Sequence, residues 1–321
     1  MAVKMPDPDS VVKYIVAPCG GGLGWVVVVI LRCAFNTAAT PTPNPSPRGG
    51  GERSQFTDSP MDLGLAGKRA LITGASKGIG LAIAQALAGE GCRIDIASRT
   101  RAALDVAADT IRKAVPGAAV QVHVADLSVI ADQDKLASAC TEVDILVNNA
   151  GAAAAGSLDD TTDAGWRASW ELKVFGYINL ARTFYRAMQA RRDGVILNVI
   201  GYAGERHNAK YVIGSTGNAA LMAFTRTAGS ASPDFGVRII GVNPGYTATE
   251  RAEGQLRAFA AKRFGDAERW REIEKEINLP FGRMATPQEI ADTVAFLVSR
   301  RAAYISGTIV TVDGGATHRN F

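Results

Sequence analysis

A glycine-rich turn between a short apolar run and a helical pattern is the first feature of this sequence that could do chemistry. The run Ala70-Leu71-Ile72 leads into Thr73-Gly74-Ala75-Ser76-Lys77-Gly78-Ile79-Gly80, and apolar residues then recur at helical spacing as far as Leu87. Glycines permit a tight turn and let backbone N–H groups approach a phosphate, whose charge the helix dipole favours. The turn therefore predicts a pyrophosphate-binding site, with a plain tight connection as the alternative.

The end of the next predicted strand, 93–97, could recognise the sugar of such a ligand. A carboxylate there would bind a ribose 2′-hydroxyl and repel a 2′-phosphate, but the residues present are Ser98, Arg99 and Thr100. Arg99 can offer a planar pair of donors to a phosphate, Ser98 can donate a hydrogen bond, and Lys77 adds a second positive charge. We therefore predict NADP(H) rather than NAD(H) as cofactor, with solvated surface charges as the alternative.

The elements that must position these residues alternate along the chain from residue 61 onward. Apolar runs typical of strands cover 70–72, 93–97, 120–124, 143–147, 195–199, 237–242 and 308–312. Helical patterns cover 78–87, 101–115, 128–140, 162–190, 217–230 and 287–299. Nearly continuous apolar strands between helices indicate a parallel sheet covered on both faces, which binds ligands at the carboxyl ends of its strands. The predicted fold class is α/β, a single doubly wound parallel sheet (Rossmann-like) with helices on both faces.

Residues 1–60 differ in character from the rest. Proline at every second position in 41–47 prevents helix or central strand, and the apolar run 23–31 is shorter than the ~18–20 residues that span a bilayer. A signal peptide is one interpretation. We favour another, in which 1–60 is a disordered or non-native extension and the working domain is 61–321, starting at Met61.

Composition excludes several classes of protein. The 321 residues carry a net charge of +4 without a Lys/Arg cluster, so we expect no nucleic-acid partner and no membrane. The four cysteines are too scattered for a disulfide framework or a metal site, which indicates a reducing, cytoplasmic location. We interpret His123, inside a predicted strand, as a structural histidine.

Further motifs follow the predicted strands, and together with the glycine-rich turn they resemble the short-chain dehydrogenase/reductase family from about Leu65 to Gly315. They are Asp126-Leu127, Asn148-Asn149-Ala150-Gly151, Asn243-Pro244-Gly245, Gly282-Arg283, Pro287-Gln288-Glu289-Ile290-Ala291, Ile305-Ser306-Gly307 and Val312-Asp313-Gly314-Gly315.

The resemblance implies a role for each matching position. In the family, the residue at Asp126 contacts the adenine amino group, the Asn-Asn-Ala-Gly backbone lines the adenosine ribose, and the Pro-Gly segment with Thr249 holds the nicotinamide end. The cofactor-binding residues so expected are Gly74, Ser76, Lys77, Gly78, Ile79, Gly80, Ser98, Arg99, Asp126, Leu127, Asn149, Ala150, Gly151, Pro244, Gly245 and Thr249.

The four catalytic positions of the family, Asn, Ser, Tyr and Lys, are altered here. Lys173 replaces the Asn and Gly201 the Ser. For the Tyr and Lys two alignments compete: one places them at Tyr211 and Ser215 with three extra residues, the other at Gly214 and Asn218 without an insertion. We favour the second. Because removing a positioned acid–base group typically costs about 10²–10⁴-fold in rate, ordinary family chemistry needs a substitute.

Three side chains could substitute. Tyr211 lies one helical turn before the usual Tyr position, Lys173 could supply a positive charge, and His207 could donate a proton. The alternatives are a packing role for Tyr211, an ion pair or solvated charge for Lys173, and an exposed loop position for His207.

The sequence thus predicts an NADP(H)-dependent oxidoreductase that transfers hydride between nicotinamide and a small carbonyl, alcohol or activated double bond at a non-standard acid–base site. The alternative is a catalytically silent NADP(H)-binding sensor or partner subunit. The segment 251–282 lies where the family places its substrate lid, and the resemblance also implies a homodimer or homotetramer.

Overall fold

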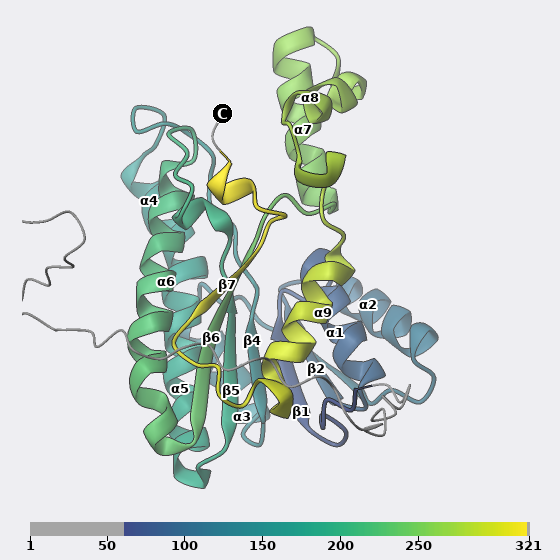
Figure 1. The fold of residues 1–321 in the computed structure, drawn as a ribbon, viewed down its shortest axis with the longest axis vertical. Helices are drawn as coiled ribbons and strands as arrows, with labels where there is room; N and C mark the ends of the chain where they lie inside the picture. The colour runs from purple at the N-terminus through teal and green to yellow at the C-terminus, as the bar shows by residue number, and fades with distance from the viewer. Residues whose placement is uncertain (1–60, 320–321) are drawn as a thin grey trace, which may run out of the picture. The chain divides into compact units, whose positions relative to one another are not determined.

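The computed structural model describes residues 61–319, and within them seven parallel strands form one sheet. The strand order is β3-β2-β1-β4-β5-β6-β7, so the chain reverses its direction of travel across the sheet between β1 and β4 (Figure 1). The predicted doubly wound α/β fold is confirmed. The prediction for residues 1–60 lies outside the described residues.

The bounds of the elements are as follows. The strands are β1 Arg69–Thr73, β2 Arg93–Ser98, β3 Val120–Val124, β4 Ile145–Asn148, β5 Gly194–Val199, β6 Val237–Pro244 and β7 Ile309–Val312. The α-helices are α1 Gly78–Gly89, α2 Arg101–Ala114, α3 Ile130–Ala139, α4 Asp163–Trp170, α5 Gly176–Arg191, α6 Val212–Ala231, α7 Glu250–Phe264, α8 Trp270–Glu276 and α9 Pro287–Val298.

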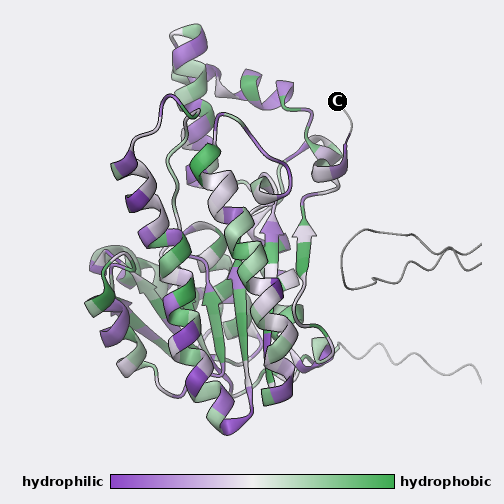
Figure 2. Cartoon of the chain, turned by 90° about the vertical axis from the view of Figure 1, so that its left-hand side faces the viewer, coloured by the Kyte–Doolittle hydropathy of each residue, from purple (hydrophilic) through white to green (hydrophobic). Residues whose placement is uncertain are grey.

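Helices cover both faces of the sheet and bury a separate apolar core on each. Helices α1, α2 and α9 pack on one face, and α3, α5 and α6 on the other (Figure 1). Hydrophobic residues concentrate on the strands, whereas the helices turn hydrophilic residues outward (Figure 2). None of the helices in residues 61–319 has the length and apolarity required to span a bilayer.

Several elements differ from those predicted. Helix α6 starts at Val212 rather than 217, and β4 starts at Ile145 rather than 143. The helical region 162–190 is interrupted by a π-helical turn, Glu171–Phe175, which joins α4 to α5. A single-turn π-bulge inside a helix is often found at functional sites, and periodicity of the apolar residues does not reveal it.

The turn after β1 is held by two side chains, Thr73 at the end of β1 and Asn149 just after β4. Thr73 Oγ1 accepts hydrogen bonds from the backbone N–H groups of Asn149 (2.9 Å) and Ala150 (3.0 Å). The Asn149 side chain donates to the carbonyls of Thr73 (3.0 Å) and Gly74 (3.2 Å). A Cβ at Gly80 would lie 2.5 Å from both Asn149 Nδ2 and the Gly74 oxygen. The close approach of the turn, α1 and the end of β4 therefore requires glycine at 80.

We predict that Gly80→Ala destabilises the fold by about 1–3 kcal/mol, because the added methyl group overpacks this contact. Gly89→Ala on the same helix is the matched control, since a Cβ there meets nothing within 4 Å. It should stabilise by about 0.4–1 kcal/mol through the unfolded state. Urea denaturation of both variants measures the difference, and equal midpoints would contradict the packing described here.

Candidate active site

The carboxyl edge of the sheet presents a helix end suited to an anion. Gly74 and Gly78 adopt positive φ values of 65° and 59°, which turn the chain from β1 into α1. The N-cap residue of α1, Lys77, makes no side-chain capping hydrogen bond. The first N–H groups of a helix lack internal partners, so those of α1 are available to a phosphate.

Two residues at the end of β2 face the same edge. Ser98 Oγ is buried and has no hydrogen-bond partner among residues 61–319, which is costly unless a ligand or water supplies one. Arg99 is exposed. The pKa of Asp126 is lowered mainly by the hydrogen bonds from Ser128, while desolvation opposes this shift and the positive charge of Arg99 adds a smaller lowering effect. Asp126 Oδ1 accepts from the N–H (3.0 Å) and hydroxyl (2.7 Å) of Ser128.

The start of α7 lies against the glycine-rich turn. Lys77 Nζ forms an ion pair with Glu250 at 2.8 Å, so this ammonium is engaged by a carboxylate. Thr249 caps α7, accepting from the Ala252 N–H at 3.3 Å, and its Cγ2 is 3.4 Å from where a Cβ on Gly78 would be. The structure therefore places Thr249 beside the glycine-rich turn, and it gives Lys77 a partner that the sequence did not indicate.

Tyr211 occupies the space beside Gly214. A Cβ on Gly214 would lie 2.0 Å from both Cε1 and Cζ of Tyr211, and 2.5 Å from its hydroxyl. The phenol ring therefore fills the volume where a side chain at 214 would begin. A tyrosine at 214 would carry its own hydroxyl farther out, at the end of its ring, so the two hydroxyl positions do not coincide. Burial, the larger effect, raises the pKa of Tyr211, and the Arg251 charge opposes it.

Gly201 and Asn218 lie together, and Asn218 follows Gly214 by about one turn on α6. Gly201 has a φ of +125°, and Asn218 Nδ2 donates to its carbonyl at 3.2 Å. A side chain at 201 would be strained at this φ, and its Cβ would lie 3.1 Å from Asn218 Nδ2. Asn218 is buried, and its Oδ1 has no partner. The pair leaves no hydroxyl and no ammonium at these two positions.

Lys173 projects from the π-helical turn toward the end of β5. Its Nζ donates to the Ile200 carbonyl at 2.7 Å, and its Cγ and Cδ would lie 3.1 Å from a Cβ on Gly151. Burial, assisted by the nearby Arg251 charge, lowers the pKa of Lys173 to about 7. Lys173 therefore carries an amine that titrates near neutrality at the carboxyl edge.

Arg251 is the residue here that sequence reasoning missed. It lies in the first turn of α7, and its Nη1 donates to the Gly151 carbonyl at 2.8 Å. Its charge acts on Lys173 and Tyr211, which are distant from it in sequence. Because α7 was not among the predicted helices, no pattern in the sequence placed Arg251 at this edge.

His207 is not brought into this group. Its side chain is exposed in the segment between the short helix Tyr202–Gly204 and α6. The segment 251–282 forms most of α7, then α8 and two short 3₁₀ turns, and it extends beyond the carboxyl edge of the sheet (Figure 1). Within it Trp270 packs with Leu256 in a small apolar cluster, whereas Phe281 is 83% exposed.

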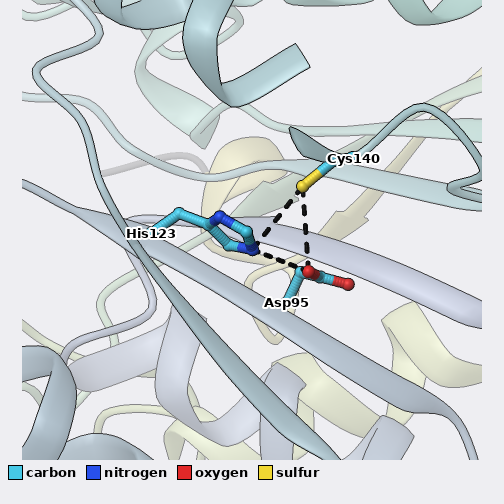
Figure 3. A group of neighbouring side chains, drawn as sticks. All are labelled: Asp95, His123 and Cys140. Carbon is cyan, nitrogen blue, oxygen red and sulfur yellow. Dashed lines mark hydrogen bonds and ion pairs between the residues drawn. The ribbon is translucent and has the colours of Figure 1, made fainter. Parts of the chain in front are cut away.

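A second polar cluster lies inside the domain, beside the C-terminal end of α3 (Figure 3). His123 Nε2 is 2.7 Å from Asp95 Oδ1, and Cys140 Sγ is 3.6 Å from the same nitrogen and 3.7 Å from that oxygen. These three could hold a metal ion by distance. However, Arg69 already donates twice to the Asp95 carboxylate, at 2.7 and 2.9 Å. A single imidazole nitrogen faces both Cys140 and Asp95, so the cluster is no catalytic triad.

Comparison with known proteins identifies the family. A model of the enoyl-(acyl carrier protein) reductase family matches residues 74–317. The chain belongs to the short-chain dehydrogenase/reductase family. Galactitol 2-dehydrogenase (L-tagatose-forming) of Cereibacter sphaeroides is 36% identical over 255 residues, which cover 79% of this chain and 96% of that protein. Cis-4-hydroxycyclohexanecarboxylate dehydrogenase of Sinomonas cyclohexanicum is 34% identical over 266 residues, which cover 80% of this chain and 99% of that protein.

The fold agrees with a solved structure of a relative. L-Sorbose reductase from Gluconobacter frateurii, solved with NADPH and L-sorbose, superposes with a TM-score of 0.74 and 31% identity, covering 81% of this chain and 100% of that one. The relatives are oxidoreductases of sugars, alcohols and acids, and this chain is accordingly a member of a nicotinamide-dependent oxidoreductase family.

We predict that Lys173→Met changes how stability depends on pH. The folded-state pKa of Lys173, about 7, lies below the ordinary 10.5, so between these values the unfolded chain binds more protons. Between pH ~7 and the ordinary pKa, the free energy of unfolding of the wild type should therefore rise relative to that of the variant by up to about 1.4 kcal/mol per pH unit. Below pH ~7 the two free energies should change in parallel. Urea denaturation at several pH values measures this, with the exposed Lys113→Met as control; parallel curves throughout would contradict it.

Proposed function

We propose that this chain is an NADP(H)-dependent oxidoreductase that transfers hydride between nicotinamide and a small carbonyl, alcohol or activated double bond. Its proton donor is Tyr211 in place of the missing family tyrosine. The observation that carries the proposal is the position of the Tyr211 ring, which fills the space beside Gly214 at the carboxyl edge of the sheet. Lys173 and Arg251 supply positive charge at the same edge.

Three features of this chain fit a phosphorylated dinucleotide. The N-terminus of α1 lacks a side-chain cap, the Ser98 hydroxyl is buried without a partner, and β2 ends in Arg99 without an acid. The proposed contacts are those expected from the family motifs: Gly74, Ser76, Lys77, Gly78, Ile79, Gly80, Ser98, Arg99, Asp126, Leu127, Asn149, Ala150, Gly151, Pro244, Gly245 and Thr249. Lys77 would have to leave Glu250 to reach a phosphate.

We predict that Arg99→Ala raises the Kd for NADPH roughly 10- to 150-fold and leaves that for NADH nearly unchanged. A charge-assisted hydrogen bond is worth about 1.5–3 kcal/mol, and Arg99 would make one to the 2′-phosphate. Arg101→Ala is the matched control, because Arg101 is paired with Asp105 on α2. Isothermal titration measures both cofactors, and tighter binding of NADH than NADPH to wild type would refute the assignment.

The buried Tyr211 hydroxyl can act as the proton donor when the substrate is a carbonyl. A bound reduced nicotinamide would supply the hydride. The raised pKa of Tyr211 keeps its hydroxyl protonated, so it can donate a proton to the oxygen that develops negative charge. Asn218, at the family lysine position in the favoured alignment, cannot supply that lysine's positive charge, because its amide is neutral and donates to the Gly201 carbonyl.

The relatives leave the charge of the substrate open. One is named for galactitol, a neutral polyol, and another for a hydroxycyclohexanecarboxylate. We propose a small-molecule substrate, and a homodimer or homotetramer in the cytoplasm.

We predict that Tyr211→Phe lowers kcat about 10²–10⁴-fold while NADPH binding is retained, because only the proton donor is removed. NADPH oxidation against a panel of ketones, aldehydes and quinones measures the effect. Tyr304→Phe, at a fully exposed tyrosine, is the control. Wild-type protein that binds NADPH but reduces nothing in the panel would instead favour a silent NADP(H)-binding protein.

A further inference from the structure

Two positive side chains at the carboxyl edge are anchored on backbone carbonyls. Arg251 Nη1 donates to the Gly151 oxygen at 2.8 Å, and Lys173 Nζ donates to the Ile200 oxygen at 2.7 Å. In residues 61–319 neither forms an ion pair with a carboxylate. The two carbonyls lie just after β4 and β5, next to each other in the sheet.

The two cations are close neighbours. The Lys173 side chain packs on the α-carbon of Gly151, whose carbonyl holds Arg251. Two like charges that share a partly buried site repel each other, and the lowered pKa of Lys173 reflects burial first and this repulsion second. Glu250, the acid nearest to Arg251 in sequence, is engaged by Lys77. An arrangement of this kind is stabilised by any anion that enters it.

Each cation also has unused donors. A guanidinium carries five N–H donors in a planar fork and an ammonium carries three, and the hydrogen bonds above use one of each. A planar fork beside a point charge suits the oxygens of a carboxylate or a phosphate.

We propose that Arg251 and Lys173 together bind an anionic group, a carboxylate or a phosphate, on the carbonyl substrate. This inference rests on the proposed function, because it assumes that the substrate enters beside Tyr211. Since Arg251 belongs to α7, binding of the anion would fix the start of α7 against the ends of β4 and β5. A neutral substrate, such as the galactitol for which one relative is named, would lack this contact.

The test compares compounds that differ in charge at one group. Binding of levulinate and methyl levulinate, and of dihydroxyacetone phosphate and dihydroxyacetone, is measured by isothermal titration with and without saturating NADP⁺. The oxidised cofactor cannot reduce the ketone group of these compounds, so binding is observed apart from carbonyl reduction. We expect at least one anionic compound to bind with a Kd ten-fold or more below that of its neutral partner. A preference within the levulinate pair would indicate a carboxylate site, and one within the dihydroxyacetone pair would indicate a phosphate site.

The variants assign the preference to these side chains. Arg251→Gln and Lys173→Met should each reduce the anionic preference, whereas Arg257→Gln, on the same helix but paired with Glu253, should leave it unchanged. The inference would be overturned if charged and neutral members bound equally, or if none of the four compounds bound. It would also be overturned if Arg251→Gln weakened both members of a pair equally, or if the variant lost affinity for NADP⁺ in place of affinity for the anion. Anion binding without NADPH oxidation by the same compounds would refute the proposed function and leave the anion site standing.

Discussion

The active edge of this protein depends on one steric constraint, the absence of a side chain at Gly214. Tyr211 precedes α6 and can fold its ring back onto the helix only because position 214 leaves that volume empty. Gly201 depends on a similar constraint, since its φ of +125° and its contact with Asn218 disfavour a side chain there. The departures from the family pattern therefore form two contacts, one between Gly214 and Tyr211 and one between Gly201 and Asn218.

The rest of the fold supplies a rigid frame for these contacts. Thr73 and Asn149 tie the glycine-rich turn to the end of β4, and the adjacent Gly151 holds Arg251 and borders Lys173. One short segment after β4 thus connects the turn that suits a phosphate with the Lys173 and Arg251 side chains. The Asp95, His123 and Cys140 cluster is separate from this frame and is held by Arg69.

The sequence predicted the sheet and its helices well, because apolar strands buried on both faces leave an unmistakable pattern. Motif spacing also assigned Gly201, Gly214 and Asn218 to the family's Ser, Tyr and Lys positions, and that assignment stays a prediction. The π-helical turn at Lys173, the early start of α6 and the role of Arg251 could not be predicted. Each depends on contacts between residues far apart in the chain, and none changes the local hydrophobic period.

The most direct test of the account is a Gly214→Ala variant, because its methyl group would lie 2.0 Å from the Tyr211 ring and must displace it. Activity should fall as far as it does when the Tyr211 hydroxyl is removed, and the double variant should lose no more than either single variant, with NADPH affinity unchanged in all three. Full activity in Gly214→Ala, or independent losses that multiply in the double variant, would contradict the claim that Tyr211 acts from the space that Gly214 leaves free.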